Sequence, residues 1–145
     1  MAFDWPFLCI SCAIRRINVI GIGEIPWDLL SSGKQLGGAP ANFAYHARAL
    51  GARSSVISRV GQDALGREIL QRLQSLGLPT ADIQVDPSAP TGTVSVALSA
   101  DGQPRFTIHE DVAWDRLALD NSALAAAAEA DAVFIPGFPP LKSRI

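Results

Sequence analysis

Apolar residues follow two different periods in the first half of the chain, which indicates alternating strands and helices. Residues 17–23 form a short β-branched apolar run, typical of a strand buried on both faces. Apolar positions recur at helical spacing over residues 41–50, and residues 54–60 predict the next strand. A second amphipathic helix is predicted over residues 63–76, with Asp63 as its N-cap. This β-α-β-α order predicts an α/β fold with helices packed on a mostly parallel sheet.

The period changes to strict alternation farther along the chain. Residues 93–98 alternate apolar and polar side chains, turn residues follow, and residues 105–110 alternate again. Such a hairpin cannot lie inside a parallel βαβ run, so we expect it to project from the main sheet. Residues 121–130 then predict an alanine-rich helix, and residues 131–135 predict a final strand.

Composition and charge exclude several function classes. A chain of 145 residues with 48% apolar and 18% charged residues is typical of one globular domain. Twelve basic and fourteen acidic residues give a net charge of −2 without a basic run, so no nucleic-acid partner is expected. The apolar stretch at residues 5–14 is too short to span a bilayer, so no membrane partner is expected either.

A glycine-rich motif and a carboxylate are the candidate chemistry. Residues 37–42 read Gly-Gly-Ala-Pro-Ala-Asn, and the paired glycines let a small polar ligand approach the backbone. Asn42 offers that ligand a donor and an acceptor. Asp28 can accept two hydrogen bonds from vicinal hydroxyls. The alternatives are a solvated turn aspartate at Asp28 and local backbone bonding by Asn42.

The spacing of this motif resembles the N-terminal signature of the ribokinase/PfkB family of carbohydrate kinases, most closely that of bacterial and plant fructokinases. The resemblance runs from about residue 17 to residue 132. It implies a ribokinase-like three-layer αβα fold with a mostly parallel sheet and a small β-strand lid near residues 24–38 and 91–110. The residues that match the signature are Gly37, Gly38, Pro40, Asn42, Ala44, Gly51 and Gly61.

The resemblance also implies roles for individual residues. Asp28 and Asn42 would bind the hydroxyls of a small-molecule sugar, and Gly37-Gly38 would form the floor of the same pocket. Asp63 fits the family's Gly-x-Asp pattern, although a helix N-cap explains it without a ligand. Trp114 and Phe106 could pack on a sugar face, although core packing is the expected role of each. A homodimer through the lid strands is suggested by the same analogy.

The family's ATP site and catalytic base lie in its C-terminal half, in a Gly-Ala-Gly-Asp loop that this sequence lacks. We therefore predict no catalytic residue here, and we expect ATP and Mg²⁺ of the intact family to bind this chain poorly. The expected unit is the N-terminal half of a kinase, truncated by a premature stop, a frameshift or a gene-fragment boundary. One open alternative is a non-catalytic remnant that binds sugar weakly or associates through an open sheet edge. Among the kinases, a 2-keto-3-deoxygluconate kinase and a nucleoside kinase also stay open.

The two ends differ from the kinase-like part at residues 17–135. Residues 1–16 are predicted to be an extension outside the family pattern, and residues 136–145 an atypical proline-rich end. Asp4 before the apolar run and arginines after it are the wrong polarity for a signal peptide. Cys9 and Cys12 lack the further ligands of a zinc site, so we interpret them as incidental thiols in a reducing cytoplasm.

Overall fold

The computed structural model describes residues 15–99 and 101–137. Within these ranges the chain forms two separate four-stranded sheets, three α-helices and one short 3-10 helix. Residues 1–14, which include Cys9 and Cys12, lie outside the described residues, as do residues 138–145 of the proline-rich end.

The main sheet is parallel throughout, as the β-α-β-α pattern predicts. Its strand order is β5-β4-β1-β8, so β1 lies between β4 and β8. Ile20 at the centre of β1 is 2% exposed, in agreement with a strand buried on both faces. The strand β5 was not predicted. The bounds are β1 (Asn18–Ile22), β4 (Arg53–Gly61), β5 (Ile83–Asp86) and β8 (Ala132–Phe134).

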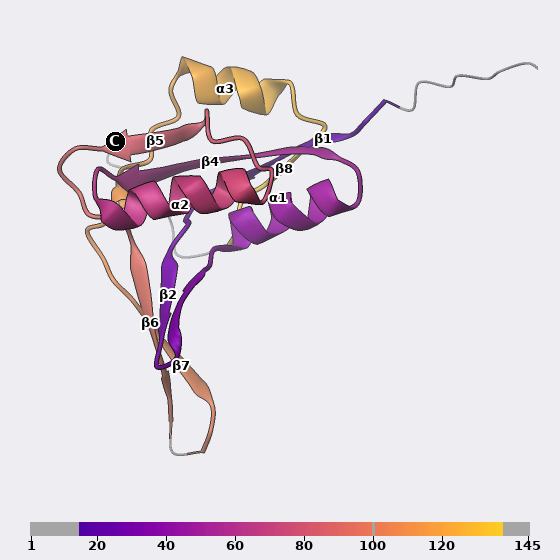
Figure 1. Cartoon of the computed structure of the whole chain (residues 1–145). Helices are drawn as coiled ribbons and strands as arrows, with labels where there is room; N and C mark the ends of the chain where they lie inside the picture. The colour runs from indigo at the N-terminus through magenta and orange to yellow at the C-terminus, as the bar shows by residue number, and fades with distance from the viewer. Residues whose placement is uncertain (1–14, 100, 138–145) are drawn as a thin grey trace, which may run out of the picture.

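Helices cover both faces of the main sheet and confirm the three-layer prediction. Figure 1 shows α1 (Ala39–Ala49) and α2 (Ala64–Ser75) on one side of the sheet and α3 (Asn121–Ala128) on the other. The core on the α1 and α2 side contains Val56, Ile69 and Leu73, while Ala123 of α3 packs in a separate cluster with Ile57. None of the described helices is long and apolar enough to cross a membrane.

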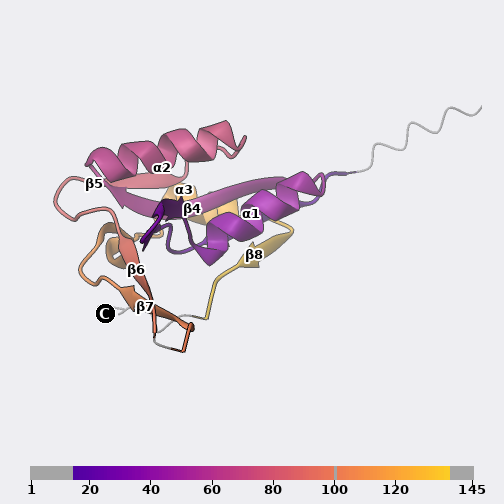
Figure 2. The same cartoon turned by 60° about the horizontal axis from the view of Figure 1, so that its bottom comes forward.

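The second sheet projects from the body, as expected for the alternating hairpin (Figures 1 and 2). Its strand order is β3-β2-β6-β7, and β6 pairs antiparallel with β7, opposing Val96 to Phe106. We call this projecting sheet the lid. It consists of β2 (Trp27–Leu30), β3 (Gly33–Leu36), β6 (Thr93–Leu98) and β7 (Pro104–Ile108). Both lid segments therefore fall within the predicted ranges, residues 24–38 and 91–110.

The helix ends follow the expected local rules. Asp63 has extended backbone angles, and its side chain accepts a hydrogen bond from the Gly66 backbone N–H, which confirms it as the N-cap of α2. The helix α1 begins at Ala39, two residues earlier than its apolar periodicity predicts, because Pro40 fits the first turn of a helix. Gly51 follows α1 with φ +93°, a conformation that favours glycine.

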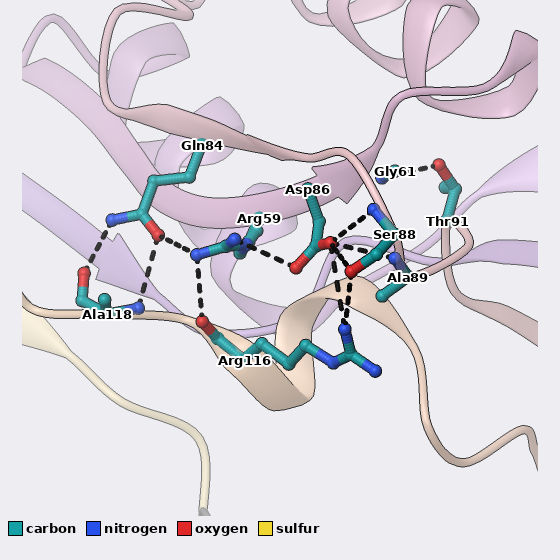
Figure 3. Close-up of polar contacts among 9 residues, drawn as sticks. All are labelled: Arg59, Gly61, Gln84, Asp86, Ser88, Ala89, Thr91, Arg116 and Ala118. Carbon is teal, nitrogen blue, oxygen red and sulfur yellow. Dashed lines mark hydrogen bonds and ion pairs between the residues drawn. The ribbon is translucent and has the colours of Figure 1, made fainter.

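A buried charged cluster ties β4, β5 and the 3-10 helix η1 (Ala113–Arg116) together (Figure 3). Asp86 is 1% exposed, and its Oδ1 accepts hydrogen bonds of 2.8 Å from both the Ser88 and the Ala89 backbone N–H. Its Oδ2 lies 2.9 Å from Nη2 of Arg59, and Arg116 lies 3.9 Å from its Oδ1. The backbone N–H groups, followed by the Ser88 hydroxyl and Arg59, hold the Asp86 pKa far below its ordinary value.

Candidate functional site

Asp28 lies in a lid strand rather than in a solvated turn. It is the second residue of β2, opposite Gln35 of β3 and Val94 of β6. Its side chain is half-buried, and this burial raises the pKa of Asp28 above the ordinary value of 3.8. A carboxylate held by a strand at the base of the lid has a defined position, which a ligand-binding group requires.

The Asp28 carboxylate lies directly against Gly37. A Cβ atom placed on Gly37 would come within 2.5 Å of Asp28 Oδ2 and 2.8 Å of Oδ1, which is closer than nonbonded atoms can approach. The Gly37 N–H donates a 3.0 Å hydrogen bond to the Pro26 carbonyl and fixes this approach. A side chain at position 37 would therefore displace the Asp28 carboxylate from its place beside α1.

Gly38 joins the loop before β2 to the start of α1. It is the N-cap of α1 with φ +100°, and a Cβ atom there would lie 2.5 Å from the Glu24 carbonyl oxygen. Its own carbonyl accepts a 3.0 Å hydrogen bond from the Asn42 N–H. The two glycines thus connect Asp28 on one side to the first turns of α1 on the other.

Asn42 is exposed in the first turns of α1. Its side-chain amide makes no hydrogen bond within residues 15–99 and 101–137, so local backbone bonding does not occupy it there. An amide of this kind can donate to one ligand hydroxyl and accept from another. The Gly37-Gly38 turn thus brings the Asp28 carboxylate and the Asn42 amide near the N-terminus of one helix.

Asp63 makes its contacts with the protein itself. Its Oδ2 accepts from the Thr91 N–H at 2.8 Å, and its Oδ1 accepts from the Thr91 hydroxyl at 2.7 Å and from the Gly66 N–H at 2.8 Å. Burial acts to raise the Asp63 pKa, but the hydrogen bonds from Thr91 and Gly66 and the charge of Arg67 outweigh it, and the net pKa is lowered. This geometry favours the capping role.

The core-packing interpretation of Phe106 is wrong. Phe106 is 63% exposed on β7. Side chains that lie opposite one another on paired strands share one face of a sheet. Asp28 lies opposite Val94, and Val94 lies opposite Ile108, so all three lie on one face of the lid. Phe106 lies two residues from Ile108 and therefore shares that face. An exposed aromatic ring on the same lid face as Asp28 is compatible with ligand contact.

The pattern of apolar and polar residues in the sequence did not identify the residues at the base of the lid. The ring of Trp114 packs so closely on Gly92 that a Cβ atom there would lie 1.7 Å from it. Trp114 thus has the packing role expected of it. The only sequence signal for this contact is the Thr91-Gly92 pair before the alternating run.

A shallow hollow is lined by six residues that include none of the predicted site: Ala81, Asp82, Gln84, Asp120, Ser122 and Ala123. No cluster of three or more histidine, cysteine or acidic side chains that could hold a metal ion occurs among the described residues.

The sequence pattern of the pfkB family carbohydrate kinases matches residues 25–145. This chain belongs to that family. The match includes residues 136–145, the proline-rich end. Because residues 25–42 carry both Asp28 and the glycine motif, the matched region contains the whole candidate site.

Three relatives illustrate the similarity. A sugar kinase of Pyrococcus horikoshii is 34% identical over 114 residues, which cover 71% of this chain and 36% of the relative. The 2-dehydro-3-deoxygluconokinase of Thermoproteus tenax is 36% identical over 107 residues, which cover 72% of this chain and 33% of that kinase. Fructokinase-2 of Solanum habrochaites is 32% identical over 104 residues, which cover 72% of this chain and 30% of that enzyme. The chain therefore spans about a third of the length of these relatives.

The crystal structure of the Pyrococcus horikoshii sugar kinase superposes with a TM-score of 0.75 at 32% identity, covering 81% of this chain and 42% of that one. The same kinase in complex with ATP gives a TM-score of 0.74. The α/β layers and the projecting lid are thus the ribokinase-like arrangement that the motif implies, over part of the kinase.

Replacing Gly37 by alanine is expected to push the Asp28 carboxylate away from α1. The Asp28 pKa should then fall toward its ordinary value, because the carboxylate moves into water. Sugar affinity should fall about fivefold, the worth of about one hydrogen bond. The pKa is measured by NMR titration of the Asp28 carboxyl carbon. Gly137→Ala is the matched control, since no atom of the described residues lies within 4 Å of a Cβ there. An unchanged Asp28 pKa in G37A would contradict the contact.

Proposed function

We propose that this chain is the sugar-binding N-terminal portion of an ATP-dependent carbohydrate kinase, similar to fructokinase, that phosphorylates a primary sugar hydroxyl. The observation that carries the proposal is the contact of Asp28 with Gly37 beside the first turns of α1. Asp28 would accept hydrogen bonds from two sugar hydroxyls, Asn42 would bind a third, and the glycine backbone would form the floor. The relatives named a fructokinase and a 2-dehydro-3-deoxygluconokinase support a sugar or sugar acid as the ligand.

The transfer of a phosphoryl group depends mainly on positioning and on electrostatic stabilisation of the phosphates. The residues of this chain would supply the first part, because they bind and orient the sugar. ATP and Mg²⁺ belong to the second part, which the family's Gly-Ala-Gly-Asp loop would provide. That loop is absent from this sequence, so we expect ATP to bind the chain poorly. We also propose a cytoplasmic location.

The experiment is a chimera with a matched control. This chain replaces the corresponding N-terminal part of the Pyrococcus horikoshii sugar kinase, and ADP release is measured with ATP, Mg²⁺ and either D-fructose or 2-dehydro-3-deoxygluconate. The proposal predicts sugar-dependent ADP release that disappears in the same chimera carrying Asp28→Asn. A folded chimera that turns over neither sugar would count against it.

The alternative is a non-catalytic chain that binds sugar, or associates with other chains, without kinase activity. The missing Gly-Ala-Gly-Asp loop favours it. It is tested by assaying the 145-residue chain alone with ATP, Mg²⁺ and D-fructose, since clear turnover would exclude it. Absence of turnover is expected under both functions. The chimera then separates them, because only a kinase portion restores sugar-dependent ADP release.

A second copy of the chain is our proposed partner for the lid. Leu98, Phe106 and Ile108 lie on one lid face and are 75%, 63% and 41% exposed. Burying such side chains against a second lid would be favourable. The edge strand β8, with Val133 41% exposed, offers a second route to association. Sedimentation equilibrium tests the dimer, and a monomer at every concentration would contradict it.

A further inference from the structure

One carboxylate fixes the base of the lid to the body. Asp63 caps α2 through the Gly66 N–H, and it also accepts two hydrogen bonds from Thr91, which immediately precedes Gly92 and β6. The Thr91 hydroxyl in turn accepts a 2.9 Å hydrogen bond from the Gly61 N–H at the end of β4. Asp63 and Thr91 therefore join β4, α2 and the segment that enters β6.

The strand that carries Asp28 depends on the same place. The Trp27 N–H donates a 3.1 Å hydrogen bond to the Gly92 carbonyl, and the Trp27 indole Nε1 donates one of 3.1 Å to the Leu65 carbonyl in the first turn of α2. The ring of Trp114 packs on Gly92 from another side. The orientation of β2 is thus set by the Thr91-Gly92 segment and by the start of α2.

The hydrogen bonds of Asp63 exceed what a helix cap requires. The N-cap of α3, Asp120, accepts one side-chain hydrogen bond, from the Ala123 N–H at 2.9 Å. Asp63 makes the equivalent bond to Gly66 and uses both oxygens for Thr91 as well. The additional bonds serve the junction of the lid with the body.

We propose that Asp63 is a positioning residue, which holds the lid at the angle that places Asp28 against Gly37 beside Asn42. The proposal rests on the proposed function, because Asp28 is carried by the lid whereas Asn42 is carried by α1 of the body. A sugar held by both residues needs a fixed relation between these two parts. Asp63 itself does not touch the sugar in this account.

Asp63→Asn separates the two roles of the residue. Asparagine is as good an N-cap as aspartate, so its carbonyl oxygen can still accept from the Gly66 N–H. Its amide NH₂ would replace Oδ2 and face the Thr91 N–H, which leaves two donors opposite one another. Asp120→Asn is the matched control, because it makes the same change at a cap whose side chain has no second partner in the described part of the chain. Thr91→Val removes the hydroxyl, and Thr91→Ser restores it.

Hydrogen exchange reports on the lid without any ligand. Exchange at the Trp27 amide should become about tenfold faster in D63N and in T91V, relative to exchange at Val56 in the core strand β4. It should stay near the wild-type rate in D120N and T91S. Affinity for D-fructose, measured by titration calorimetry, should fall about threefold in D63N and T91V and stay unchanged in the two controls.

Each outcome decides one part of the proposal. Unchanged Trp27 exchange in both D63N and T91V would overturn the role of Asp63 in holding the lid. Faster exchange with unchanged affinity for D-fructose would overturn its role in positioning Asp28. Wild-type protein that binds neither D-fructose nor 2-dehydro-3-deoxygluconate would overturn the proposed function and the sugar-positioning role with it. The exchange comparison is made without sugar, so it distinguishes that failure from failure of the Asp63–Thr91 contact.

Discussion

Asp28→Asn is expected to lower sugar affinity about 30-fold while leaving the melting temperature unchanged or slightly higher. A carboxylate that accepts two hydrogen bonds from hydroxyls makes charge-assisted bonds, and the neutral amide keeps one weaker acceptor. Titration calorimetry with D-fructose and with 2-dehydro-3-deoxygluconate measures the affinity. Asp82→Asn is the control, because its side chain makes no hydrogen bond in the described part of the chain.

The expected effect on stability follows from the direction of the pKa shift. Burial raises the Asp28 pKa, so the folded state binds this proton more tightly than the unfolded state does. The ionised carboxylate therefore opposes folding at neutral pH, and a neutral amide of the same shape removes that cost. A large loss of melting temperature in D28N would show instead that Asp28 has a structural role.

The same shift predicts the pH dependence of sugar binding. Affinity should fall as the pH is lowered through the Asp28 pKa, which lies above the ordinary 3.8. The D28N protein should lack this dependence. Equal pH profiles for the two proteins would mean that another group controls binding.

Asp86→Ala is expected to be the most destabilising change in the polar interior, with a melting temperature lower by about 10 °C or more. It removes the acceptor for the Ser88 and Ala89 N–H groups and leaves the 23% exposed Arg59 side chain without its carboxylate. Asp86→Asn should lose less, because its carbonyl oxygen can keep the two backbone bonds while the ion pair is lost. Differential scanning calorimetry gives both values.

The pH dependence of this effect has a defined sign. The folded-state pKa of Asp86 is depressed, so its stabilisation is fully present above the unfolded value, near 3.8, and is lost as the pH falls toward the folded pKa. The difference between wild type and D86N should therefore be largest above about pH 5 and shrink below about pH 4. Glu68→Gln, at the exposed pair with Lys34, is the control and should change little. A difference independent of pH would contradict the ion-pair account.

The main sheet and its helices could be predicted because burial imposes a period on the sequence. Residues 18–22 and 54–60 lie in the central strands of the sheet and are largely buried, and Asp63 has the local signature of a cap. The strand β5 could not be predicted in this way. Its four residues are too short to show a period, and its place depends on contacts of Asp86 with Arg59, which is distant in sequence.

The candidate site was predictable in its residue types and not in its geometry. The motif at residues 37–42 indicates a ligand-binding loop, but the contact of Asp28 with Gly37 exists only because β2 and β3 pair and return the chain to α1. The lid pairing also explains why the expected core packing of Phe106 is wrong, because β7 projects from the body and leaves the ring exposed. Long-range pairing of this kind leaves no local pattern.

The central claim is that Asp28, Gly37, Gly38 and Asn42 form one sugar-binding surface. The most direct measurement is a titration of the isotope-labelled chain with D-fructose and with 2-dehydro-3-deoxygluconate, followed by the backbone amide and Asn side-chain NMR signals. We expect the shifts that saturate with one of these sugars to cluster at these four residues and to vanish in D28N. Saturable shifts confined to other residues, or shifts that persist unchanged in D28N, would contradict the account.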